Sequence, residues 1–100
     1  MIRVSAEVAA DHPALAGHFP GNPIVPAVVL LSRVCVAVAG ACGADVVGLP
    51  GVKFLAPLAP GEHFDIEFEE PGTSGAVKFS VVRGATVIAA GALRLQGRTG

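Results

Sequence analysis

One apolar stretch limits what this chain of 100 residues can fold into. Residues 26–41 contain only two strongly polar side chains, Ser32 and Arg33. Proline suits the first turn of a helix, where its missing N–H would have no partner, so Pro26 predicts a helix start. Gly43 predicts the helix end, because glycine readily adopts the left-handed conformation that closes helices. Since nearly every side of this helix is apolar, we expect the rest of the chain to surround it.

The same stretch raises the question of a membrane span, because residues 23–44 are long and apolar enough to be considered. Arg33 falls in its middle, and an arginine there costs at least about 2.5 kcal/mol in a bilayer. The N-terminus shows a strand pattern rather than the positively charged start of a signal peptide. We therefore expect a buried helix and no membrane partner.

Two other stretches show the alternation of apolar and polar side chains that is typical of a half-buried strand. The first is residues 2–10, and the second is residues 63–69. In the second, Phe64, Ile66 and Phe68 share one face, and acids occupy the other. We interpret the acids as a solvated strand face rather than a carboxylate site: Asp65, Glu67, Glu69 and Glu70.

The remaining strand candidates are separated by turn residues. Residues 46–55 are interrupted by Leu49-Pro50-Gly51, so we expect a loop or edge segment first and a firmer strand at 52–54. Further strands are expected at 76–82 and 86–95, with turns at 57–61, 71–75 and 84–85. One long apolar helix followed by an antiparallel meander predicts a single α+β domain over residues 1–100, with the sheet curled around the helix.

Composition adds an expectation about assembly. The chain is 52% hydrophobic and has no Trp or Tyr, so it holds more apolar surface than a small monomer easily hides. An oligomeric interface would cover that surface. The net charge is −1 and the basic residues are scattered, which argues against nucleic acid as a partner. We interpret Arg94 and Arg98 as solvated charges, the alternative being contact with an acidic partner.

The two cysteines, Cys35 and Cys42, are seven residues apart on the predicted helix. They share a side of it but lie too far apart to bridge within one helix. With only two cysteines and no spacing that suits a metal, we expect reduced packing residues in a cytoplasmic protein.

The segment before the helix carries one ionisable ring in an irregular backbone. The string G-H-F-P-G-N-P-I-V-P, residues 17–26, holds His18 among three prolines and two glycines. The adjacent helix start offers unpaired N–H groups and a partial positive charge. This combination suits binding a carbonyl oxygen and moving a proton beside it. His12 and His63 have no such surroundings, and we expect them to be surface residues.

Two motifs resemble one family. G-H-F-P-G-N-P-I-V-P-A-V-V-L-L, residues 17–31, resembles the active-site segment of the β-hydroxyacyl-acyl-carrier-protein dehydratases of the FabA/FabZ type. V-K-F-L-A-P-L-A-P-G-E, residues 52–62, resembles the second signature of that family. The two motifs cover about a quarter of the chain, which is shorter than most such enzymes.

The resemblance implies the hotdog fold and an assembly. It implies a homodimer, or a larger assembly of dimers, in which two sheets join and each active site lies between subunits. A histidine of one subunit then faces an acid on the central helix of the other. The implied substrate is an acyl thioester on acyl carrier protein or coenzyme A, and no metal or redox cofactor is implied.

Matched to the family motif, particular residues receive roles in removing water from a 3-hydroxyacyl thioester. His18 is the base, whose neutral imidazole suits proton removal near neutral pH. The Ala27 N–H replaces a glycine N–H of the family as the donor to the thioester carbonyl. Gly21 lets the substrate pass close to the backbone. The expected substrate-binding residues are Phe19, Gly21, Pro26, Ala27 and Val28.

The acid position departs from the family. Fourteen residues after His18, where the family carries Asp or Glu, this chain has Ser32. A hydroxyl is a poor proton donor, and general acid help is commonly worth roughly 10²–10⁴ in rate. A homodimer of this chain is therefore expected to be a weak dehydratase or none. Arg33 points elsewhere on the helix and is no simple replacement.

Three functions follow as hypotheses. The first is a 3-hydroxyacyl-acyl-carrier-protein dehydratase, or a dehydratase-like protein, of fatty acid or polyketide-type synthesis. The second is a non-catalytic acyl-thioester-binding subunit of a heterodimer with an acid-bearing paralogue. The third is an acyl thioesterase, since one fold supports several reactions.

Overall fold

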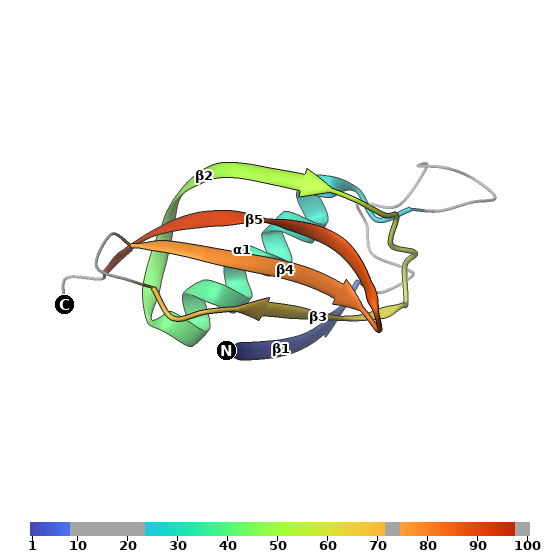
Figure 1. Ribbon diagram of the computed structural model, residues 1–100, viewed down its shortest axis with the longest axis horizontal. Coiled ribbons are helices and arrows are strands. Elements are labelled where there is room, and N and C mark those ends of the chain that lie inside the picture. Colours follow the sequence, from blue (N-terminus) through green and yellow to red (C-terminus); the bar gives the residue numbers. More distant parts are fainter. Residues whose placement is uncertain (9–23, 72–74, 98–100) are drawn as a thin grey trace.

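The computed structural model describes residues 1–8, 24–71 and 75–97. Within these ranges the chain forms one helix and five strands (Figure 1). His12, expected to be a surface residue, lies outside these ranges. The elements in chain order are β1 Ile2–Glu7, α1 Ala27–Cys42, β2 Ala44–Phe54, β3 His63–Phe68, β4 Ala76–Arg83 and β5 Thr86–Gly97.

The strands form a single antiparallel sheet in the order β1-β3-β4-β5-β2. Strands β3, β4 and β5 follow one another as a meander, while β1 and β2 occupy the two edges. The sheet curves, and α1 lies against its concave side (Figure 1). This arrangement confirms the predicted α+β class with a sheet wrapped around one helix.

The ends of α1 follow the two predicted signals. Pro26 is the N-cap in an extended conformation, and its carbonyl accepts bonds from the N–H groups of Val29 and Leu30 at 3.1 and 3.2 Å. Gly43 closes the helix in the left-handed conformation, with φ 62°, and donates its N–H to the Ala39 carbonyl. A side chain at Gly43 would strain this turn.

The core lies between the sheet and α1. Phe64, Ile66 and Phe68 of β3 are at most 2% exposed, as their alternation predicted. On the other face of β3, Asp65 accepts a hydrogen bond from Ser5 at 2.8 Å, and Glu67 accepts one from Arg3 at 2.9 Å. The acids thus lie on the outer face of the sheet, where two of them connect β3 to β1.

A bulge in β5 changes which side chains reach the core. Val81 pairs with Ala89 and Val82 pairs with Val87, which leaves Ile88 as an extra residue. Ile88 and Ala89 are consecutive, yet each is only 1% exposed. A regular strand would have turned one of the two toward solvent.

Strand β2 is longer than the sequence predicted. Leu49-Pro50-Gly51 lies inside one continuous strand that pairs with β5, so of the two alternatives predicted there, the loop is not found. The prediction of an edge is confirmed. The proline is tolerated because β2 is an edge strand, and the register shifts on both sides of Gly48 absorb the irregularity.

The prediction that α1 is enclosed on all sides was wrong for the single chain. Its inner face, formed by Leu30, Val34 and Val38, is at most 3% exposed. Its outer face carries Val28, Ser32 and Val36, and the two valines are 75% and 69% exposed. The five-stranded sheet covers only one side of the helix.

Within residues 1–8, 24–71 and 75–97, no helix has the length and apolar character that crossing a bilayer requires.

Candidate functional site

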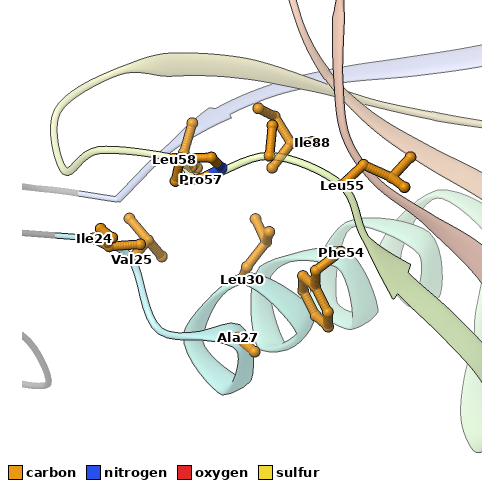
Figure 2. A pocket seen from close by; sticks show the side chains of 10 residues that line it. Ile24, Val25, Ala27, Leu30, Phe54, Leu55, Pro57, Leu58 and Ile88 are labelled. Atoms are coloured by element: carbon orange, nitrogen blue, oxygen red, sulfur yellow. The ribbon is translucent and has the colours of Figure 1, made fainter.

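An apolar pocket of about 390 Å³ lies between the start of α1 and the segment that follows β2 (Figure 2). Apolar side chains from four parts of the chain converge on it: the approach to the helix, the helix itself, the segment 54–58, and β5. Its lining consists of Ile24, Val25, Ala27, Leu30, Phe54, Leu55, Ala56, Pro57, Leu58 and Ile88. A pocket of this size and lining suits a short hydrocarbon chain.

The first turn of α1 adds the polar element of this pocket. The N–H groups of Val29 and Leu30 bond to the Pro26 carbonyl, whereas those of Ala27 and Val28 have no acceptor within the helix. Proline provides no side-chain cap, and the first turn carries no acidic residue. The positive end of the helix dipole therefore meets no carboxylate of the helix itself, and Ala27 lines the pocket.

The opposite wall, residues 55–58, is held mainly by backbone hydrogen bonds. The Ile88 carbonyl accepts bonds from the N–H groups of Leu55 and Ala56 at 2.8 and 3.3 Å. The Leu58 carbonyl accepts a bond from the Val25 N–H at 2.8 Å. These bonds connect the two motif segments to each other and to the bulged residue of β5.

The predicted site residues fall on different sides of the helix. Ala27 lies in the pocket, and Pro26 caps the helix beside it. Val28 and Ser32 lie on the outer face, around a second hollow of about 240 Å³ that also includes Val36. Three further predicted site residues lie outside the described residues: His18, Phe19 and Gly21.

The remaining candidate groups do not form a second site. His63 is exposed in β3 opposite Glu7. Cys35 and Cys42 are free and half-buried, and burial raises the pKa of both thiols, with the charge of Glu70 adding to the effect at Cys42. Among residues 1–8, 24–71 and 75–97, no group of three His, Cys, Asp or Glu is arranged to hold a metal ion.

Sequence reasoning missed two parts of the pocket. Leu30 and Ile88 line it from α1 and β5. Leu30 falls within the first motif, residues 17–31, and that motif was the signal available for it, whereas Ile88 sits in an ordinary apolar run. The wall from Phe54 to Leu58 falls within the second motif, residues 52–62, and that motif was the signal available for it.

Comparisons with known proteins agree with this geometry. A family model described as ApeI-like, ApeI dehydratase, matches residues 1–92. The 3-hydroxyacyl-acyl-carrier-protein dehydratase FabZ of Granulibacter bethesdensis is 34% identical over 73 residues, which cover 62% of this chain and 43% of the relative. FabZ of Myxococcus xanthus is 30% identical over 81 residues, covering 70% and 53%. The chain thus spans about half the length of the curated relatives it matches.

Two solved structures show the shared fold. The dehydratase heterocomplex ApeI:P from Xenorhabdus doucetiae has a TM-score of 0.79 at 21% identity, covering 93% of this chain and 84% of that chain. The (R)-hydratase from A. caviae involved in PHA biosynthesis has a TM-score of 0.73 at 15% identity, covering 97% and 93%. At these identities the likeness shows the hotdog fold, as the sequence motifs predicted.

Proposed function

Because the chain belongs to the ApeI-like dehydratase family, we propose that it is a dehydratase-like hotdog subunit that binds a 3-hydroxyacyl thioester. The carrier is acyl carrier protein or coenzyme A, and the setting is fatty acid or polyketide-type synthesis in the cytoplasm. Residues 1–100 act as one domain in this proposal. The observation that carries it is the apolar pocket beside the start of α1, where Pro26 provides no side-chain capping hydrogen bond.

The pocket and the helix start suit the two ends of such a substrate. The acyl chain lies among Leu30, Phe54 and Ile88, where its transfer from water is favourable. The thioester carbonyl lies at the first turn of α1 and accepts a hydrogen bond from the Ala27 N–H. A donor of this kind stabilises the negative charge that develops on the carbonyl oxygen, by about 3–4 kcal/mol in a well-studied case.

The proposed reaction is the loss of water across two carbons. The His18 imidazole takes a proton from the carbon next to the carbonyl, and the electron pair of that C–H bond forms the enolate and then the new C=C bond. The C–O bond to the hydroxyl breaks, and the hydroxyl leaves as water once it is protonated. The proton that the leaving hydroxyl receives must come from an acid, and the Ser32 hydroxyl is a poor proton donor.

A second chain completes this site in the proposal. Apolar side chains are exposed on the outer face of α1 and along the edge strand β2, where Val47 and Leu49 are 54% and 43% exposed. Surface of this kind, beside an edge strand of the described sheet, is typical of an interface. A partner hotdog subunit covering it would hide Val28 and Val36 and extend the sheet.

Ser32 favours a heterodimer as the second candidate. It is exposed on the outer face of α1, pointing away from this chain's own pocket and toward the proposed partner. A partner that carries Asp or Glu at the matching position would offer its acid to His18 of this chain. The similar structure named as a dehydratase heterocomplex supports two different subunits. Here this chain supplies a pocket and a base, and its partner supplies the acid.

The test follows enoyl-thioester formation by absorbance, with a 3-hydroxyacyl thioester and the purified protein. We expect little activity from the parent, and activity higher by roughly 10²–10⁴ in the Ser32→Glu variant. His18→Ala in the Ser32→Glu background should remove that gain. Ser32→Gln is the matched control, because it adds similar bulk without an acid.

Three results would contradict the proposal in different ways. Release of free thiol without an enoyl product would favour the thioesterase, a reaction found on the same fold in the fluoroacetyl-CoA-specific thioesterase FlK, which has a TM-score of 0.67. Dehydratase activity in the parent equal to that of the Ser32→Glu variant would show that no acid from a partner is needed. No binding of any acyl thioester would reject the function itself.

A further inference from the structure

One side-chain network fixes the pocket wall formed by residues 55–58. It joins Arg83, the last residue of β4, to the turn that follows the wall. We propose that Arg83 and Glu62 are positioning residues that hold this wall in place and thereby set which acyl lengths the pocket accepts. This inference rests on the proposed function, because it assumes that the pocket holds an acyl chain.

The turn itself is rigid for a local reason. In Ala59-Pro60-Gly61-Glu62, proline occupies the second position, and Gly61 has φ 83° at the third, as a type II turn requires. The Glu62 N–H donates to the Ala59 carbonyl at 3.3 Å. In return, the Ala59 N–H donates to Glu62 Oε1 at 2.8 Å. The Glu62 carboxylate is therefore held by its own turn, independently of its contact with Arg83.

Arg83 connects this fixed carboxylate to the wall. Its Nη1 donates to Glu62 Oε1 at 3.1 Å and to the Pro57 carbonyl at 3.0 Å. Pro57 lines the pocket, and the next residue, Leu58, is 2% exposed and lines it too. The guanidinium thus sets the position of the peptide between two lining residues.

Among the hydrogen bonds described for the backbone of residues 55–58, the bond to the Pro57 carbonyl is the one that a side chain makes. The others join backbone atoms of Ile88 and Val25 to the wall, so truncating a side chain does not remove them. The side chains of Arg83 and Glu62 are 33% and 38% exposed, so solvent screens their ion pair. Their role is consequently better sought in the shape of the pocket than in the stability of the fold.

A wall held this closely makes the pocket selective. One methylene that fits or fails to fit an apolar pocket changes affinity by about 10-fold to 200-fold. That discrimination requires that the wall does not yield to a longer chain. When Arg83 no longer holds the Pro57 carbonyl, the wall can move, and neighbouring chain lengths should bind more alike.

The experiment measures the binding of acyl-pantetheine thioesters that lengthen by two carbons at a time, by titration calorimetry. We expect the parent to discriminate against the first overlong chain by about tenfold or more. Arg83→Met keeps the aliphatic stem but has no hydrogen-bond donor. In this variant, the ratio of affinities between the best-fitting chain and the first overlong chain should fall by at least about threefold. Glu62→Gln keeps an acceptor for the Ala59 N–H and should retain most of the parent's profile.

Arg3→Met is the matched control, since it breaks the Arg3–Glu67 ion pair, which lies on the outer face of the sheet. It should leave the length profile unchanged. If Arg83→Met does not fold, Glu62→Ala removes the carboxylate that holds the Arg83 guanidinium beside the Pro57 carbonyl. Amide exchange at Leu55 and Ala56, whose N–H groups donate to the Ile88 carbonyl, provides a readout without ligand. We expect this exchange to be faster in Arg83→Met than in Arg3→Met.

The outcomes separate the two proposals. A parent that discriminates, with an unchanged profile in Arg83→Met and Glu62→Ala, overturns the positioning role and leaves the proposed function intact. The same holds if Arg83→Met weakens all chain lengths equally or only lowers the melting temperature. A parent that binds no member of the series overturns the proposed function and the selectivity role with it.

Discussion

The two faces of α1 have nearly the same composition and opposite environments. The inner face places Leu30, Val34 and Val38 at intervals of four residues, and all three are at most 3% exposed. The outer face has Val28, Ser32 and Val36 at the same intervals, and its valines are 75% and 69% exposed. One helix therefore presents both a core surface and an apolar surface that the chain's own sheet leaves open.

The difference teaches that apolar character identifies surfaces that need covering, but not what covers them. A five-stranded sheet covers the inner face of this chain. For the outer face, a second chain is our proposal, and the small size of the chain makes such help expected. Substitutions on the two faces should therefore affect different properties, namely folding on one face and assembly on the other.

The largest expected effect is that of a charge on the inner face. Val34 is 0% exposed, so Val34→Asp would bury a carboxylate among apolar side chains, at a cost of several kcal/mol. That is a large part of the total stability of a small domain, about 5–15 kcal/mol. We expect the variant to be unfolded, and far-ultraviolet circular dichroism measures the loss of secondary structure.

The same charge on the outer face should act on assembly. Val36→Asp leaves the carboxylate in water in the single chain, and we expect a folded protein with a smaller mass by light scattering. If Val36→Asp keeps the parent's mass, the outer face is not the interface. If Val34→Asp folds normally, the inner face is not the core that the structure describes.

A smaller effect is expected from truncating apolar side chains. Leu30→Ala leaves a cavity between α1 and the sheet and should lower the free energy of unfolding by about 2–5 kcal/mol. Val28→Ala should change it by about 0.5 kcal/mol or less in a dilute, dissociated sample. Urea unfolding followed by circular dichroism measures both. Equal losses for the two variants would remove the distinction between the faces.

Two glycines near the end of α1 should respond in opposite directions. Gly43 has φ 62°, so Gly43→Ala should destabilise the protein by about 1–2 kcal/mol. Gly40 is in the helix interior and exposed, with open space where a Cβ would lie, so Gly40→Ala should stabilise it by about 0.5–1 kcal/mol. Thermal unfolding measures both. A loss of stability in Gly40→Ala would indicate that a partner packs closely there.

The smallest expected effect is the pH dependence of stability that the two cysteines cause. Cys35 and Cys42 are half-buried at the boundary between the two faces of α1. Burial raises the pKa of both thiols above that of an unfolded chain. The folded state therefore keeps its thiol protons at a pH where the unfolded chain loses them. This contribution is complete below the unfolded pKa and is lost as the pH rises through the folded pKa, which predicts declining stability above about pH 9.

The control for this prediction is the double variant Cys35→Ala, Cys42→Ala. Urea unfolding between about pH 8 and pH 10 measures the free energy of unfolding, which should decline less steeply with pH in the double variant than in the parent. An equal slope in both proteins would mean that other groups dominate the alkaline behaviour.

Local patterns were sufficient for most of the fold. The cap residues Pro26 and Gly43 predicted the ends of α1, and alternation predicted the buried face of β3. At Leu49-Pro50-Gly51 the sequence left a loop and an edge segment open, because a proline excludes a central strand but not an edge, and strand order cannot be obtained from such patterns. For the site, the two motifs indicated the helix start and the wall. Ile88 could not be predicted, because a bulge turns it inward.

The sequence by itself determined the class of fold, the ends of its helix and the family, since turn residues, caps and motifs act over a few neighbouring positions. Only the tertiary structure decided which side of α1 is buried, and that Arg83 reaches the turn at Glu62, 21 residues away in the chain. The physical reason is that burial and side-chain contact depend on strand order and register. These bring distant residues together, and composition does not record them.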